Sequence, residues 1–333
     1  MSAALRIGVA GLGTVGGGVL TLLAKHRDLV SQRAGRAIEV VAVAARDRAK
    51  DRGLDLTRIT RHGDPGALAG DPPVDVRVEL MGGSEGSARA LVEAALAAGK
   101  PVVTANKALI AHHGTALARL AEAKDTTFAF EAAVAGGIPV IKMLREGLAA
   151  NEFRRIYGIL NGTCNYILTT MRESGREFAD VLADAQRLGY AEADPAFDVD
   201  GVDAAHKLAI LAALAFGCEV AFDKVKIEGI RQISALDIAY AAELGLRIKL
   251  IGLAQLVEGA LEQRVSPVLV PLDAPIATVE GVFNAVVAEG DSVGTVMAEG
   301  RGAGAGPTAS AVVADLIDIA RGRALPPFAL PAG

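Results

Sequence analysis

Residues 5–18 read LRIGVAGLGTVGGG, and this pattern predicts the fold of the first part of the chain. LRIGVA has the composition of a buried strand, and a helical pattern begins directly after it. The glycines between them form a G-x-G-x-x-G pattern in the strand–turn–helix context that binds a dinucleotide at the helix N-terminus. A glycine-rich turn without a ligand is the alternative. The predicted cofactor contacts are Gly11, Gly13, Thr14, Val15 and Gly16.

Arg46 follows the second predicted strand, at the place where an acidic residue would bind a free ribose 2′-hydroxyl. Arg48 and Lys50 lie close to it in the sequence. Because an arginine at this place favours a 2′-phosphate, we predict NADP as the cofactor, with NAD as the alternative. A solvated basic turn without a ligand would explain the same residues.

Short apolar runs alternate with helical patterns in the first part of the chain, which is typical of a parallel sheet covered by helices. We expect strands at 5–10, 38–45, 74–80, 101–104 and 127–131, and helices at 14–29, 87–98 and 108–123. From Leu246 onward, extended runs separated by Gly, Pro and Asp predict a mainly antiparallel sheet. A final helix at 308–320 is expected to return to the first domain.

The predicted fold class is therefore α/β, with a Rossmann-type doubly wound parallel sheet and a second α+β domain for catalysis and dimerisation. The dinucleotide-binding domain would comprise residues 1–150 with 307–333. The substrate-binding and dimerisation domain would comprise residues 151–306.

The composition restricts the function classes. The chain has 333 residues, 51% of them hydrophobic, and a formal net charge of -5, which is typical of a globular protein without the basic excess of a nucleic-acid binder. Its two cysteines, Cys164 and Cys218, cannot form a disulfide framework, and no apolar run reaches the ~20 residues that a bilayer requires. We expect a cytoplasmic protein with neither a nucleic-acid nor a membrane partner.

The segment 189–207, GYAEADPAFDVDGVDAAHK, concentrates carboxylates immediately before an apolar helix. Asp203 and Lys207 are four residues apart and share one face of that helix. A calcium loop is excluded, because Ala196 and Lys207 would occupy positions that need acidic ligands. The run after Lys207, LAILAALAF, is apolar enough to be buried, so we expect the ammonium to be buried with it. Burial would lower the pKa of Lys207 and carboxylates would raise it, so its protonation state stays open. A capped helix with an ordinary Asp–Lys pair remains the alternative.

Several segments in one order resemble the homoserine dehydrogenase family: 11–19 (GLGTVGGGV), 104–107 (TANK), 161–166 (NGTCNY), the acidic segment 189–207, and the glycine-rich 302–310. The resemblance covers nearly the whole chain. It implies an oxidoreductase that interconverts L-homoserine and L-aspartate 4-semialdehyde, both small molecules, with a nicotinamide cofactor in threonine, methionine and isoleucine biosynthesis.

The resemblance also implies roles for individual side chains. Lys207 would donate and accept the proton at the substrate oxygen and contact the substrate, and Asp203 would organise it. Lys107 would lie close to the nicotinamide and the substrate. Glu192 and Asp198 would hold the amino and hydroxyl ends of homoserine.

Two further sites are implied by the resemblance alone. Gly304 would approach the cofactor. A monovalent cation, Na⁺ or K⁺, would be held mainly by backbone carbonyls of the segment 131–138, at Glu131, Val134, Gly136 and Ile138. A tight turn at Gly136-Gly137 with unusual dihedral angles would explain the same glycines.

Many members of the family carry a C-terminal regulatory domain that binds an amino acid, whereas this sequence ends at PPFALPAG. The resemblance therefore implies a short form with weak or no inhibition by threonine, and a homodimer formed through residues 246–299. Two rival functions share the glycine loop. One is another amino-acid dehydrogenase or reductase, such as one acting on aspartate, and the other is a non-catalytic NADP-binding regulator.

Overall fold

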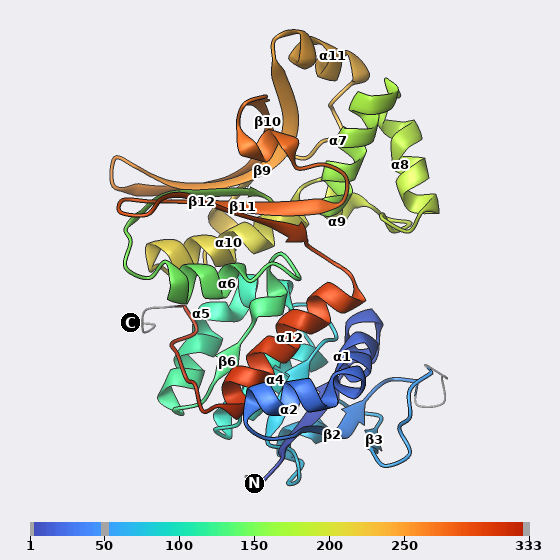
Figure 1. Cartoon of the computed structure of the whole chain (residues 1–333), viewed down its shortest axis with the longest axis vertical. Helices are drawn as coiled ribbons and strands as arrows, with labels where there is room; N and C mark the ends of the chain where they lie inside the picture. The colour runs from blue at the N-terminus through green and yellow to red at the C-terminus, as the bar shows by residue number, and fades with distance from the viewer. Residues whose placement is uncertain (1–2, 48–52, 329–333) are drawn as a thin grey trace. The chain divides into compact units, whose positions relative to one another are not determined.

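The chain forms two compact units in a computed structural model that describes residues 3–47 and 53–328. One unit comprises Met1–Arg145 with Ala303–Gly333, and the other comprises Glu146–Gly302. The divisions lie a few residues before the predicted 150 and 306. Each unit is built on a six-stranded sheet with helices packed against it (Figure 1).

The first unit has the predicted doubly wound parallel sheet, with strand order β3-β2-β1-β4-β5-β6. Its strands are β1 (Leu5–Ala10), β2 (Ile38–Ala44), β3 (Thr60–His62), β4 (Val76–Glu79), β5 (Val102–Thr104) and β6 (Phe128–Ala129). The central strands are buried, which explains their near-continuous apolar sequences. The short edge strand β3 escaped prediction because its sequence, TRH, has no apolar signal.

Two helices of this unit differ from the prediction. The expected helix 14–29 is two helices, because the backbone leaves helical geometry at His26. The last helix begins at Ala305 rather than Thr308, directly after Gly304, and packs against the first helix. The elements are α1 (Thr14–Lys25), α2 (Arg27–Ala34), α3 (Ala67–Gly70), α4 (Ser87–Ala97), α5 (Lys107–Ala123), η1 (Glu131–Ala133), α6 (Val140–Lys142), η2 (Met143–Gly147) and α12 (Ala305–Ala320).

The second unit has a sheet of order β12-β11-β7-β9-β10-β8, antiparallel except for the β8–β10 pair. The predicted mainly antiparallel sheet is therefore confirmed. Its strands are β7 (Phe153–Ile159), β8 (Lys226–Ile227), β9 (Leu246–Val257), β10 (Ala260–Pro271), β11 (Phe283–Gly290) and β12 (Gly294–Arg301). Its helices are α7 (Gly162–Ser174), α8 (Phe178–Arg187), α9 (Ala196–Val199), α10 (Val202–Phe216), η3 (Phe222–Lys224), α11 (Ala235–Glu243) and η4 (Pro275–Thr278).

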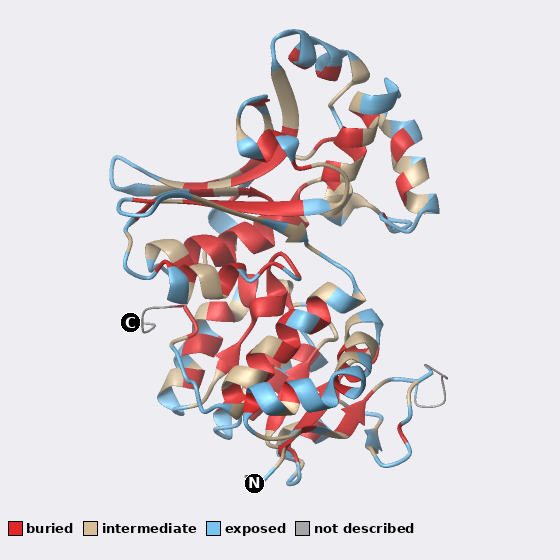
Figure 2. Cartoon of the chain, in the orientation of Figure 1, coloured by how far each residue is buried: buried red, intermediate tan, exposed pale blue. Residues whose placement is uncertain are grey.

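Helix α10 lies against β7, β9 and β10 of this sheet. Figure 2 shows burial concentrated along this helix and on the strands of both sheets. Its residues from Asp203 to Leu214 are all buried, so any polar group among them must find a partner inside the protein. Among the described residues, none of the helices combines the length and the apolar character needed to cross a membrane.

Candidate functional site

The glycine loop lies where the strand order of the parallel sheet reverses, between β1 and β4. In open α/β sheets this switch point, at the carboxyl ends of the strands, is where ligands bind. Gly11 has φ +95°, and a Cβ on it would lie 2.7 Å from the carbonyl oxygen of Leu80. A Cβ on Gly16 would lie 2.0 Å from the carbonyl oxygen of Gly11. Both positions therefore require glycine to bring strand, loop and helix together.

The N-terminus of α1 is suited to a phosphate group. Its N-cap is Gly13, which supplies no side-chain cap, and its first turn carries no acidic residue. A Cβ on Gly13 would meet no atom within 4 Å, so the space beside it is open. Thr14 and Val15 are the first two helical residues. The uncapped backbone N–H groups and the helix dipole favour an anion at this end.

Arg46 is placed at the same edge of the sheet. It lies two positions after the end of β2, and Ala44 of that strand pairs with Ala10 of β1. Its side chain is exposed. Arg48 and Lys50, the other basic residues of the predicted turn, lie outside the described residues.

Gly304 is the N-cap of α12, with φ +114°. The following residue lies against α1, since a Cβ on Gly18 would be 2.7 Å from the carbonyl oxygen of Ala305. This contact brings the start of α12 to the early turns of α1, close in space to the glycine loop. Lys107 also lies at the carboxyl edge, as the half-buried first residue of α5 after β5.

Lys207 is the central group of the second unit. It is only 7% exposed, and its Nζ donates to the carbonyl oxygen of Leu160 (2.7 Å) and to Oδ2 of Asp203 (2.8 Å). The predicted i, i+4 pair is thus a buried ion pair rather than a solvated surface pair. An ammonium has three N–H donors, and two of them have acceptors among the described residues. The third can be directed to a ligand.

Asn161 joins the carboxylates of this cluster. Its Nδ2 donates to Oδ1 of Asp198 and to Oδ2 of Asp203, both at 2.8 Å. Its Oδ1 accepts from the backbone N–H of Cys164 and so caps α7. The segment NGTCNY contributed to the family resemblance, but no role of Asn161 as an N-cap or as a partner of the two carboxylates was predicted. The available signal was an asparagine followed by a helical pattern, which is typical of an N-cap.

Glu192 is not brought into contact with Lys207. It is exposed, and its backbone carbonyl oxygen accepts a hydrogen bond from Nε2 of Gln186 (3.0 Å). Asp198 lies on α9 and reaches the cluster through Asn161. The structure therefore assembles Asp198, Asp203 and Lys207 and leaves Glu192 on the neighbouring loop.

The segment 131–138 combines a buried carboxylate with an unusual turn. The two oxygens of Glu131 accept from the backbone N–H groups of Ile141 and Lys142, each at 2.9 Å. Burial, and then the nearby Asp315 carboxylate, raise the pKa of Glu131 to about 7. Ala135 and Gly136 both have positive φ. Among the described residues no group of three or more His, Cys, Asp or Glu side chains could hold a metal ion. A cation here would therefore depend on backbone carbonyls.

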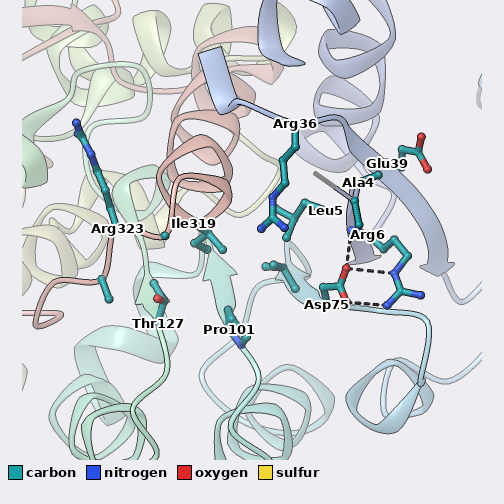
Figure 3. A pocket seen from close by; sticks show the side chains of 14 residues that line it. Ala4, Leu5, Arg6, Arg36, Glu39, Asp75, Pro101, Thr127, Ile319 and Arg323 are labelled. Carbon is teal, nitrogen blue, oxygen red and sulfur yellow. Dashed lines mark hydrogen bonds and ion pairs between the residues drawn. The ribbon is translucent and has the colours of Figure 1, made fainter. Parts of the chain in front are cut away.

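A large cavity of the first unit lies at the other edge of the sheet. It has a volume of about 810 Å³ and is lined by the amino ends of strands, including Leu5 and Val76, and by Thr127 just before β6 (Figure 3). The exposed ion pair between Arg6 and Asp75 borders it. Because the glycine loop lies at the carboxyl ends, this cavity is not the dinucleotide site.

Comparisons with known proteins agree with this geometry. A family model described as the NAD binding domain of homoserine dehydrogenase matches residues 11–131, and a second model described as homoserine dehydrogenase matches residues 139–317. The first match begins at the glycine loop. The second covers the whole of the Lys207 cluster.

Individual relatives extend the match over almost the whole chain. A homoserine dehydrogenase of Pseudomonas aeruginosa is 53% identical over 95% of this chain and 72% of its own length. The crystal structure of one from Thiobacillus denitrificans superposes with a TM-score of 0.93, at 51% identity over 96% of this chain and 74% of that one. A hyperthermophilic archaeal homoserine dehydrogenase in complex with NADPH has a TM-score of 0.78, at 27% identity over 95% of this chain and 97% of that one.

Proposed function

The chain belongs to the homoserine dehydrogenase family, and we propose that Lys207 is its acid–base group. The members of this family are oxidoreductases that interconvert L-homoserine and L-aspartate 4-semialdehyde with a nicotinamide cofactor. The observation that carries this proposal is the buried contact of Lys207 with Asp203 and Leu160. The substrate is a small molecule. Neither rival enzyme nor regulator explains two family models that together span most of the chain.

The chemistry follows from the charge that develops on the substrate. A bound nicotinamide supplies the hydride to the aldehyde carbon or receives it from the alcohol. Hydride addition leaves negative charge on the oxygen, and the ammonium of Lys207 stabilises that charge and donates a proton to it. In the oxidative direction the same amine takes up the hydroxyl proton. Asp203 fixes the direction of the Lys207 side chain, and Lys107 supplies a second positive charge at the cofactor.

The carboxylates near Lys207 suit the α-ammonium of an amino acid. We assign Asp198 and Glu192 to substrate binding, with Asp198 held in place by Asn161. Because Glu192 lies on an exposed loop, we expect it to reach the substrate only when that loop closes over it. The charge-assisted contacts would then order the loop.

The activity is tested by the absorbance change of the nicotinamide when homoserine is added with NADP⁺ or NAD⁺. The proposed function predicts turnover with homoserine and none with aspartate. Turnover with aspartate instead would assign the chain to the rival dehydrogenase, and cofactor binding without turnover of either amino acid would assign it to the regulator.

We assign Arg46 to the adenosine 2′-phosphate, and NADP as the preferred cofactor. Removing one exposed charge–charge contact costs about 1–2 kcal/mol, so Arg46→Ala should raise the KM for NADP⁺ by roughly tenfold. The KM for NAD⁺ should change little, because NAD⁺ has no 2′-phosphate. Steady-state kinetics with both cofactors measures this. A wild-type preference for NAD⁺ would remove Arg46 from the site.

We also assign a monovalent cation, Na⁺ or K⁺, to carbonyl oxygens of Val134, Gly136 and Ile138 together with Glu131. The donor set fits, because a hard cation prefers oxygen ligands and would offset the buried charges of Glu131 and Asp315. The cation would hold this turn in place.

Potassium or sodium chloride should therefore raise the Tm of the wild type above its value in choline chloride of equal ionic strength. At a cation concentration of 100 Kd, binding adds about 2.7 kcal/mol of stability. Glu131→Gln should abolish the difference, whereas the exposed control Glu39→Gln should retain it. Equal Tm values of the wild type in all three salts would exclude the site.

We infer a homodimer formed through the second unit. Large apolar side chains are exposed on its strands β9 and β10, at Leu256 and Leu269, and on α11, at Leu236 and Tyr240. Leu236 and Tyr240 are four residues apart on one face of α11, and exposed apolar side chains that lie together favour an interaction surface. Light scattering should give twice the chain mass of 34.1 kDa. A particle of 34.1 kDa would contradict the dimer.

The free thiols support a cytoplasmic location. Cys164 is buried and Cys218 is exposed, and neither forms a disulfide. Burial raises the pKa of the Cys164 thiol well above its ordinary value, so this cysteine is unreactive. We therefore place the protein in a reducing compartment, the cytoplasm.

A further inference from the structure

Three neighbouring strands of the first unit end in one row. Ala10 of β1 pairs with Glu79 of β4, and Glu79 pairs with Thr104 of β5. Paired residues of a parallel sheet direct their side chains to the same face, and this row lies at the carboxyl edge beside the glycine loop. The side chain of Glu79 is therefore placed between the two loops that follow β4 and β5.

Glu79 is a completely buried carboxylate with three donors. Its Oε2 accepts from the hydroxyl of Thr104 (2.6 Å), and its Oε1 accepts from the backbone N–H groups of Met81 (2.7 Å) and Gly82 (3.3 Å). A buried charge is costly, and these contacts offset its cost. One carboxylate thus holds the backbone after β4 and the last side chain of β5.

Thr104 links Glu79 to the start of the helix that carries Lys107. Its hydroxyl oxygen accepts from the backbone N–H of Asn106 (3.0 Å). The Nδ2 of Asn106 donates to the carbonyl oxygen of Gly83 (2.7 Å), and its Oδ1 caps α5 by accepting from the N–H of Leu109 (3.1 Å). These bonds tie the loop 81–83 to the start of α5, where Lys107 is the first helical residue.

The same loop also abuts the cofactor-binding turn. A Cβ on Gly11 would lie 2.7 Å from the carbonyl oxygen of Leu80 and 3.1 Å from Cγ of Met81. The network therefore connects the glycine loop, the loop after β4 and the residue before Lys107 in one row of contacts.

We propose that Glu79 is a positioning residue, which acts through Thr104 and Asn106 to fix Lys107 and the loop 81–83 at the nicotinamide end of the site. This inference rests on the proposed function of Lys107. The direction of the bonds matters: the Thr104 hydroxyl donates to Glu79 and accepts from Asn106, so Glu79 must be an acceptor there. Glu79 accepts bonds at both oxygens and a glutamine has only one, so its amide group would face either the Thr104 hydroxyl or the N–H groups of the loop after β4 and break the network.

Thr104→Val and Glu79→Gln test the proposal, because each breaks the network with almost no change of volume. Misplacement of a catalytic group by about 1 Å can cost 10²-fold in rate, so we expect kcat to fall by about 10- to 100-fold. The Kd for the cofactor, measured by nicotinamide fluorescence, should change less than threefold, since the glycine loop is intact. Thr104→Ser, which keeps the hydroxyl, should restore most of kcat.

Val103→Ala is the matched folding control. Val103 is the adjacent residue of β5, is fully buried in the apolar core and contributes no side chain to the network. It should lower Tm and leave kcat near the wild-type value. If Thr104→Val or Glu79→Gln does not fold, Asn106→Asp replaces it, since this change keeps the cap of α5 and removes the donor to Gly83.

Different results would contradict the positioning role of Glu79 and the proposed activity of the enzyme. Wild-type kcat in Thr104→Val and Glu79→Gln, or equal losses of kcat in these variants and in Val103→Ala, would overturn the positioning role. A wild-type protein that does not oxidise homoserine would instead contradict the proposed function. A loss of kcat confined to the network variants, with recovery in Thr104→Ser, supports the proposal.

Discussion

Lys207→Ala is expected to lower kcat for homoserine oxidation by about 10²–10⁴, the usual contribution of a general acid–base group. The lysine is buried, and Asp203 and Leu160 fix the direction of its ammonium. Lys207→Arg should lose nearly as much activity, because a guanidinium keeps the charge but does not exchange its proton near neutral pH. The measurement is the rate of homoserine-dependent NADP⁺ reduction.

Two controls distinguish the loss of a proton donor from damage to the fold. Lys224→Ala removes an exposed lysine of the same unit and should leave both kcat and Tm unchanged. Adding a small alkylamine to Lys207→Ala should recover part of the activity, since the amine can occupy the space left by the side chain. A Lys207→Ala enzyme that turns over at nearly the wild-type rate would eliminate the mechanism.

The second large effect concerns stability. Arg77 is 1% exposed and donates to five backbone carbonyl oxygens, those of Leu68, Ala69, Asp71, Val74 and Asp75. Burial lowers the pKa of this guanidinium. The side chain of Arg77 fixes the connection that leads into β4. The sequence pattern did not predict this role. Because Arg77 is buried between the apolar Val76 and Val78 and binds these carbonyl groups, it holds this connection in place.

Arg77→Met should lower the free energy of unfolding by about 3–5 kcal/mol, because it leaves several buried carbonyl oxygens without donors. Arg6→Met is the matched control. Arg6 is a solvent-exposed arginine at the same edge of the sheet, paired with Asp75, and surface pairs of this kind contribute little. Urea unfolding followed by circular dichroism compares the two variants. Equal midpoints for Arg77→Met and the wild type would show that water replaces the guanidinium without cost.

The fold of the first unit could be predicted because its signals are local. The glycine loop, the apolar strand before it and the helix after it lie within about twenty residues, and each depends on short-range geometry. The break at His26 and the short strand β3 could not be predicted, because no glycine or proline marks the first and no apolar residue marks the second. Helix α11 was also missed, although Ser234 and Asp237 form a capping box at its start.

Part of the site in the second unit depends on contacts between residues that are far apart in the sequence. The spacing of Asp203 and Lys207 placed them on one face of a helix, and the apolar run that follows predicted the burial of Lys207, which the structure confirms. Neither pattern indicated which groups from other elements join the two side chains. Asn161 reaches Asp198 across 37 residues and Asp203 across 42. Such contacts exist only after α7 and α10 have docked on the sheet, so they carry no signal in the local pattern.

The α/β class and the dinucleotide turn follow from the sequence, and its resemblance to a family indicated the candidate site residues. Only the folded chain shows that Asn161 joins Asp198 to Asp203 beside Lys207, and that Glu79 joins two loops at one sheet edge. The two kinds of feature differ in how far apart the interacting residues lie in the sequence. Hydrophobic periodicity and turn chemistry act over a few residues, whereas a buried polar group is satisfied by whichever donors the completed fold brings to it.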